Sequence, residues 1–136
     1  MSGNTERPVF SLVIPIKWGD MDAYGHVNNT VYFRLFEEAR IQWLTSLSLS
    51  ADGTGTGPII ITTGATFLRE MGYPANVRVE LLTGRAGTTS LETFYQLVDN
   101  DTQQPYAEGY AKVVWFDHET RGSTALPDEL RALAAE

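Results

Sequence analysis

The sequence predicts an α+β fold in which a five-stranded antiparallel sheet wraps around one long central helix. Sustained helical periodicity occurs in one long segment, residues 30–47, and four strand-like segments follow it consecutively. Consecutive strands joined by short turns favour antiparallel pairing, and one apolar helix can cover one face of such a sheet. The length of 136 residues fits a single domain, which we take as residues 1–136.

Composition narrows the class of protein. Hydrophobic residues make up 43% and charged residues 20% of the chain, which is typical of a globular protein. No apolar run reaches the 18 residues of a membrane span, and the N-terminus lacks a signal-peptide pattern, so we expect no membrane association. The absence of cysteine excludes disulfides and fits a cytoplasmic protein. A net charge of −7 with scattered basic residues argues against nucleic-acid binding.

The chain begins with a strand and a polar loop. Residues 10–17 alternate between apolar and other side chains, which predicts a strand, and Pro15 indicates an edge strand or a bulge. The loop at residues 19–29 is acidic, rich in asparagine and bounded near its ends by Gly19 and Gly25. Polar groups are therefore concentrated directly before the helix.

The helix is predicted over residues 30–47 and is expected to be largely buried, because few of its positions are purely polar. Asn28 or Asn29 can cap it, since a short amide oxygen accepts from free N–H groups of the first turn. The spacing also predicts two surface ion pairs on the helix, Arg34–Glu38 and Glu37–Arg40.

The remaining segments are mostly strand-like. Residues 48–58 read as a flexible connection and residues 85–87 as a hairpin turn. A short C-terminal helix is predicted over residues 126–135. The predicted strands are residues 59–69, 77–82, 88–98 and 105–117. A single helix leaves the second face of such a sheet uncovered, so we expect a homodimer or homotetramer.

The loop and the helix together carry a multi-position pattern. Residues 19–29 read GDMDAYGHVNN, and the helix continues with Tyr32, Arg34, Ala39 and Arg40 at fixed spacing. With the strand order, this pattern resembles the hotdog-fold acyl-CoA thioesterases, specifically the 4-hydroxybenzoyl-CoA thioesterase-like family. The resemblance implies a hotdog fold and hydrolysis of a coenzyme A thioester to a carboxylic acid and free CoA.

The resemblance also implies the reacting groups. It makes Asp22 the catalytic carboxylate, acting either as a nucleophile that forms a mixed anhydride or as a general base that activates water. The chain offers no cysteine nucleophile and no triad-like pattern of Ser, Lys and His. The family's backbone amide at the helix start, which polarises the thioester carbonyl, corresponds to Asn29.

Neighbouring residues have more than one interpretation. Asp20 is expected to bond loop amides, whereas His26 can either orient a water or Asp22, or be structural. Core packing is the favoured interpretation of Tyr32 and Trp43, and ion pairing is favoured for the helix glutamates. No His lies at helical spacing from these glutamates, so we expect no metal site, and we expect no cofactor.

The resemblance implies an acyl-CoA substrate whose acyl chain enters between subunits. Candidate phosphate contacts are Arg69, Arg85 and Arg121, and the turn containing Thr88 and Thr89 offers donors near the pantetheine. An acyl carrier protein is another thioester carrier, but its acidic surface would meet a chain of net charge −7.

Two other functions use the same fold. One is a non-catalytic acyl-CoA-binding module, as in ligand-sensing regulators that carry an added DNA-binding segment, for which we expect no room before Phe10. The other is a hydratase or dehydratase, whose usual Asp and nearby His would be Asp22 and His26. The loop and helix pattern favours the thioesterase.

Overall fold

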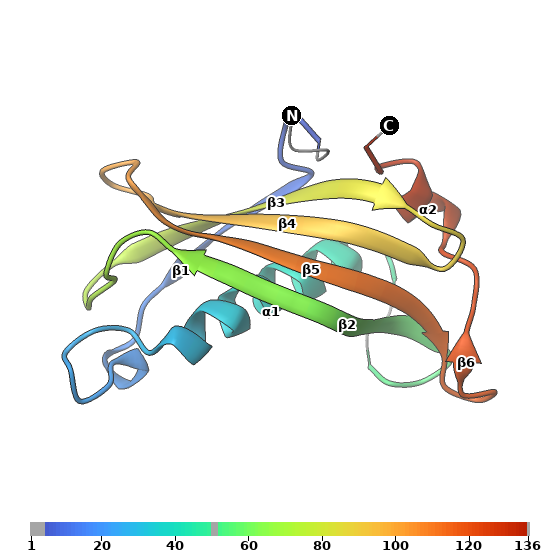
Figure 1. The fold of residues 1–136 in the computed structure, drawn as a ribbon, viewed down its shortest axis with the longest axis horizontal. Coiled ribbons are helices and arrows are strands. Elements are labelled where there is room, and N and C mark those ends of the chain that lie inside the picture. Colours follow the sequence, from blue (N-terminus) through green and yellow to red (C-terminus); the bar gives the residue numbers. More distant parts are fainter. Residues whose placement is uncertain (1–4, 50–51, 136) are drawn as a thin grey trace.

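Five long strands form one antiparallel sheet in the protein, for which we use a computed structural model that describes residues 5–49 and 52–135. The strand order is β1-β3-β4-β5-β2, and a two-residue strand, β6, pairs with β5. The elements are β1 Phe10–Pro15, the 3₁₀ turn η1 Trp18–Asp20, α1 Asn29–Ser46, β2 Thr56–Phe67, β3 Asn76–Ala86, β4 Ser90–Asp99, β5 Pro105–Asp117, β6 Gly122–Ser123 and α2 Asp128–Arg131. The predicted α+β fold, a sheet around one long helix, is confirmed (Figure 1).

Helix α1 lies along one face of the sheet and supplies much of the core (Figure 1). Phe36 stacks on Tyr95 of β4 with ring centroids 4.9 Å apart, and it packs under Gly109 of β5. The other fully or nearly fully buried apolar residues of the helix are Tyr32, Leu35, Ala39, Trp43 and Leu44. Burying a large apolar side chain of this kind contributes about 1.5–3 kcal/mol, so this face fixes the helix against the sheet.

The two edges of the sheet differ in kind. In the part of the chain that the structure describes, β1 is an edge strand that pairs only with β3, which is one of the two outcomes that Pro15 predicts, because a proline cannot donate to a second neighbour. β2 forms the other edge and carries a register shift between Ile60 and Thr62. Ile61, inside this irregularity, has 54% of its surface exposed. The β2 edge is therefore both apolar and unpaired in the part of the chain that the structure describes.

The predicted ion pairs of the helix are wrong. Arg34 instead donates from Nη2 to Oδ1 of Asp20 at 2.9 Å. Arg40 is buried and donates from Nη1 to the Tyr95 hydroxyl at 2.9 Å. Both arginines point toward tertiary partners because the sheet and the polar loop pack against the flanks on which they lie, which spacing along a helix cannot reveal.

Several predicted boundaries also change. β3 continues through Ala86, so the hairpin turn lies at residues 87–89, where the Gly87 N–H donates to the Ser90 carbonyl. α2 is shorter than predicted, because the chain after Arg131 turns onto β3, where the Ala135 N–H donates to the Gly84 carbonyl. No helix in the described ranges has the length and apolar character needed to cross a membrane.

Candidate active site

A small hairpin carries Asp22. An antiparallel bridge joins Met21 to Val27, and within it the Asp22 N–H donates to the His26 carbonyl at 2.9 Å. The Gly25 N–H donates back to the Asp22 carbonyl at 3.1 Å. Gly25 has a φ of +80°, a conformation that glycine adopts without strain. The backbone around Asp22 is therefore fixed by local hydrogen bonds.

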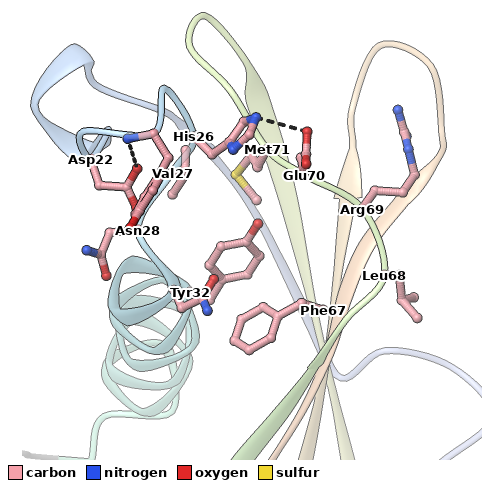
Figure 2. Close-up of a pocket in the computed structure, with 12 residues that line it drawn as sticks. Asp22, His26, Val27, Asn28, Tyr32, Phe67, Leu68, Arg69, Glu70 and Met71 are labelled. Carbon is pink, nitrogen blue, oxygen red and sulfur yellow. Dashed lines mark hydrogen bonds and ion pairs between the residues drawn. The ribbon is translucent and has the colours of Figure 1, made fainter.

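One oxygen of the Asp22 carboxylate is engaged and the other is not. Oδ1 accepts from the Tyr24 N–H at 2.9 Å, which holds the side chain against its own loop (Figure 2). No described group donates to Oδ2. A carboxylate held at one oxygen keeps a basic, nucleophilic oxygen for a ligand.

Asp20 lies in a different environment, buried between the loop and the helix. Its Oδ1 accepts from Arg34, and its Oδ2 accepts from the Lys17 N–H at 2.8 Å. Its carbonyl accepts from the Asn28 N–H at 3.0 Å. These contacts agree with the structural interpretation of this residue.

The first turn of α1 presents an unbonded amide. Asn28 is the N-cap, and its Oδ1 accepts from both the N–H and the hydroxyl of Thr30, at 2.9 and 2.8 Å. Within the described residues, no group accepts from the Asn29 N–H. A free amide at a helix start adds to the positive end of the helix dipole and suits a developing negative charge.

The opposite wall comes from the segment that follows β2, residues 67–71. The Val27 N–H donates to the Met71 carbonyl at 2.7 Å, and His26 Nε2 lies 2.9 Å from Glu70 Oε2. Phe67 meets the ring of Tyr32 edge to face, with centroids 4.8 Å apart. Because these contacts tie the hairpin to the end of β2, a pocket lies between them.

This pocket has a volume of about 600 Å³ and brings together four of the eight predicted site residues. Figure 2 shows charged groups around its upper rim and the rings of Tyr32 and Phe67 below. Its lining residues are Asp22, Tyr24, His26, Val27, Asn28, Asn29, Tyr32, Phe67, Leu68, Arg69, Glu70 and Met71. The three predicted catalytic residues and Arg69 therefore share one pocket.

Tyr32 gives the pocket a neutral polar floor. Burial raises the pKa of its hydroxyl, a backbone hydrogen bond with Met71 opposes the rise, and the Glu70 charge adds to it. The hydroxyl therefore stays protonated at neutral pH. It can donate or accept a hydrogen bond but does not carry charge.

Four predicted substrate contacts lie elsewhere in the chain. Arg85 is the penultimate residue of β3, Thr88 and Thr89 lie in the β3–β4 turn, and Arg121 follows β5. This end of the sheet lies opposite the N-terminus of α1 (Figure 1). The Thr88 and Thr89 carbonyls accept from Leu126 and Trp115 N–H groups, at 3.1 and 2.7 Å. Within one chain, the fold does not bring these four residues to the pocket.

Most of the 67–71 wall is not predicted from the sequence. Glu70, Met71 and Phe67 are separated from the Asp22 loop by about 45 residues of sequence and meet it because β2 runs back along the helix. The available signal is the mixture of apolar and charged residues directly after a predicted strand. That pattern predicts where the strand ends, but it does not predict which residues the strand end contacts.

Comparison with known proteins gives the family. A family model described as the thioesterase-like superfamily matches residues 16–133. The solved structure of the PA2801 protein from Pseudomonas aeruginosa, provisionally described as a thioesterase, is 42% identical in sequence and has a TM-score of 0.88. The match covers 93% of this chain and 98% of the PA2801 chain. A provisional acyl-CoA thioesterase from Xanthomonas campestris, XC229, is 28% identical with a TM-score of 0.77, covering 88% of this chain and 100% of its own.

A sequence relative extends the comparison. The uncharacterized protein YsmA of Bacillus subtilis (strain 168) is 25% identical over 116 residues, 85% of this chain and 78% of that protein. The matching family model spans the polar loop, the helix and all the long strands after β1. The chain belongs to the thioesterase-like superfamily of hotdog-fold thioester hydrolases.

Proposed function

We propose that this protein is an acyl-CoA thioesterase that hydrolyses a CoA thioester to a carboxylic acid and free CoA. The observation that carries the proposal is one pocket lined by both the Asp22 carboxylate and the helix start at Asn29. A thioester carbonyl needs an attacking oxygen and a donor for its developing oxyanion, and these two groups supply them. The likeness to the provisional acyl-CoA thioesterase of Xanthomonas campestris supports CoA as the thiol carrier.

Asp22 acts in one of two ways. As a nucleophile, its free oxygen bonds to the carbonyl carbon, the C–S bond breaks, CoA leaves as the thiolate, and water hydrolyses the mixed anhydride. As a general base, Asp22 takes a proton from water, whose oxygen attacks the carbonyl directly. In both routes the Asn29 N–H donates to the carbonyl oxygen. Finding ¹⁸O in Asp22 after single-turnover hydrolysis in H₂¹⁸O would establish the nucleophilic route, because general-base attack places the label in the product acid alone.

The functional unit that we propose is a homodimer joined along the free edge of β2. Within residues 5–49 and 52–135 this edge strand has no second neighbour, and it exposes Ile61 and Phe67, so it offers a template for pairing with another strand. Antiparallel pairing of two β2 edges would place the Thr56 end of one copy beside the Phe67 end of the other.

Such pairing also accounts for the dispersed substrate contacts. In the register of β2 with β5, Thr56 pairs with Asp117, and Arg121 follows four residues later. The second copy would therefore bring Arg121 toward the Asp22 pocket, with Arg85, Thr88 and Thr89 two strands further from the edge. Adjacent strands lie about 4.8 Å apart, a spacing that an extended CoA molecule can bridge. Arg69 would contribute from the chain that holds the pocket.

Sedimentation tests the dimer. Analytical ultracentrifugation of wild-type protein should give a molar mass of twice or four times 15.1 kDa. Ile61→Asp should lower this molar mass, because it places a charge on the paired edge. Val13→Asp, on the exposed side of β1, is the matched control and should keep the wild-type mass. A wild-type monomer would contradict the proposal.

A thiol-release screen across acetyl-, hexanoyl- and benzoyl-CoA tests the activity. Asp22→Asn and Asp22→Ala should lower kcat by about 10²-fold or more on the best thioester. Asp101→Asn, in the exposed β4–β5 turn, should retain wild-type turnover. Wild-type kcat in Asp22→Ala would overturn the role of Asp22. The absence of turnover by wild-type protein would favour the acyl-CoA-binding module.

The hydratase interpretation is weakened by the position of His26. Its ring nitrogen Nε2 contacts Glu70, and no described contact joins its side chain to the Asp22 carboxylate. Assaying water addition to an enoyl-CoA beside thiol release separates the two reactions. We expect thiol release alone.

A further inference from the structure

One contact in the pocket is not used by the proposed chemistry. His26 Nε2 lies 2.9 Å from Glu70 Oε2, and the two side chains point toward one another across the rim in Figure 2. The pair joins the Asp22 hairpin to the wall that follows β2. The side chains are 45% and 76% exposed, so this contact adds little to the stability of the fold.

We infer that Glu70 is a positioning residue that fixes the tautomer of His26, so that Nδ1 is available to accept a hydrogen bond from a water molecule in the pocket. A carboxylate only accepts hydrogen bonds, and a neutral imidazole carries one N–H. The nitrogen that faces Glu70 must therefore be the protonated one. This inference rests on the proposed function, because the oriented water is the one consumed in hydrolysis.

The backbone around His26 leaves the ring orientation to Glu70. The His26 carbonyl accepts from Asp22, and the next N–H, that of Val27, donates to the Met71 carbonyl. The main chain is thus held on both sides of the pocket rim. Among the described residues, Glu70 is the sole hydrogen-bonding partner of the His26 side chain.

Other charged groups near the pair do not replace this contact. Arg69, the neighbour of Glu70, lies with its guanidinium carbon 5.5 Å from the centre of the Tyr106 ring and forms no described ion pair. Asp22 bonds the Tyr24 N–H through Oδ1. The Tyr32 hydroxyl is neutral, because burial raises its pKa and the Glu70 charge adds to that rise.

Nitrogen chemical shifts test the tautomer directly. The chain has two histidines, so His118→Gln identifies the His26 signals in a ¹⁵N spectrum. In alkaline buffer, where imidazole is neutral, we expect wild-type His26 to be protonated at Nε2. Glu70→Lys places a donor opposite Nε2 and should move the proton to Nδ1, whereas Glu70→Ala should give a mixture. Wild-type protonation at Nδ1, or identical shifts in all three proteins, would overturn the inference.

A double-mutant cycle tests the consequence for turnover. Glu70→Lys should lower kcat about two- to fivefold, the range expected for a partly exposed charged contact, with a smaller change in KM. Glu108→Lys makes the same charge change at an exposed position of β5 and should retain wild-type kcat. In a His26→Ala background, Glu70→Lys should cause no further loss. The same loss with and without His26 would overturn the positioning role.

The nitrogen chemical shifts and the kinetic measurements together distinguish a failure of this inference from a failure of the proposed function. If wild-type protein releases no thiol, the proposed function fails, while the nitrogen shifts still decide whether Glu70 sets the tautomer. If wild-type protein is active and Glu70→Lys is as active as Glu108→Lys, the positioning role alone fails.

Discussion

Arg34 donates a 2.9 Å hydrogen bond from Nη2 to Oδ1 of Asp20, which ties the helix to the polar loop that precedes it. This contact separates the two aspartates of the loop by role. Asp20 is buried and engaged at both oxygens, whereas Asp22 lies on the pocket wall with one free oxygen. The loop therefore contains one architectural carboxylate and one available to a substrate.

Replacing Asp20 should lower the stability of the fold, whereas replacing Asp22 should leave stability almost unchanged. Asp20→Asn removes the charge that Arg34 faces in a buried site, so the free energy of unfolding should fall by about 1–3 kcal/mol. Asp22→Asn keeps an oxygen for the Tyr24 N–H and should change stability by less than about 0.5 kcal/mol. Urea denaturation of both variants measures the difference. Equal losses of stability would contradict this division.

Close packing at Gly109 should make even a methyl group costly. A Cβ at this position would lie 2.4 Å from Phe36 Cζ, and the Phe36 ring is stacked on Tyr95 and cannot move aside. Gly109→Ala should therefore lower the free energy of unfolding by about 1–3 kcal/mol. In a Phe36→Leu background, Gly109→Ala should cost less than in wild type, because the clashing ring atoms are gone. Additive losses in the double variant would show that the contact is not the cause.

The buried arginine of α1 depends on one hydroxyl. Tyr95 accepts from Arg40 and lies 2.7 Å from the Thr93 hydroxyl, which also donates to the Ala111 carbonyl. Tyr95→Phe leaves a buried guanidinium nitrogen without its partner and should cost about 1–3 kcal/mol in thermal or chemical unfolding. Tyr73→Phe, at an exposed position, is the control and should stay within about 0.5 kcal/mol of wild type.

Alkaline pH should weaken the fold through Tyr106. Burial and the 2.9 Å hydrogen bond to Asp99 raise the pKa of this hydroxyl from 10.0 to about 12. Because the pKa of this hydroxyl is raised in the folded state, its protonated form contributes its full stabilisation below pH 10. This contribution is lost as the pH rises toward 12. The stability advantage of wild type over Tyr106→Phe should shrink across this interval by on the order of 2 kcal/mol. A constant difference from pH 8 to 12 would contradict this assignment.

Much of the fold follows from local pattern. The alternation of residues 105–117 matches β5, and the helix predicted over residues 30–47 differs from α1 by one residue at each end. Pro15 predicts an edge strand or a bulge, and β1 is an edge strand. These features could be predicted because period, capping and proline chemistry act within a few residues of the chain. The partners of Arg34 and Arg40 could not, because they come from other elements.

The fold class, the long helix and the loop that presents Asp22 can all be predicted from local sequence pattern and from the order of the elements along the chain. Three features depend on the packing of distant segments. The wall after β2 closes the pocket, Glu70 faces His26, and the other end of the sheet carries Arg85, Thr88, Thr89 and Arg121. The physical reason is strand pairing over long sequence separations. The register of β2 with β5 sets where β2 ends, and this in turn sets which side chains meet the Asp22 loop.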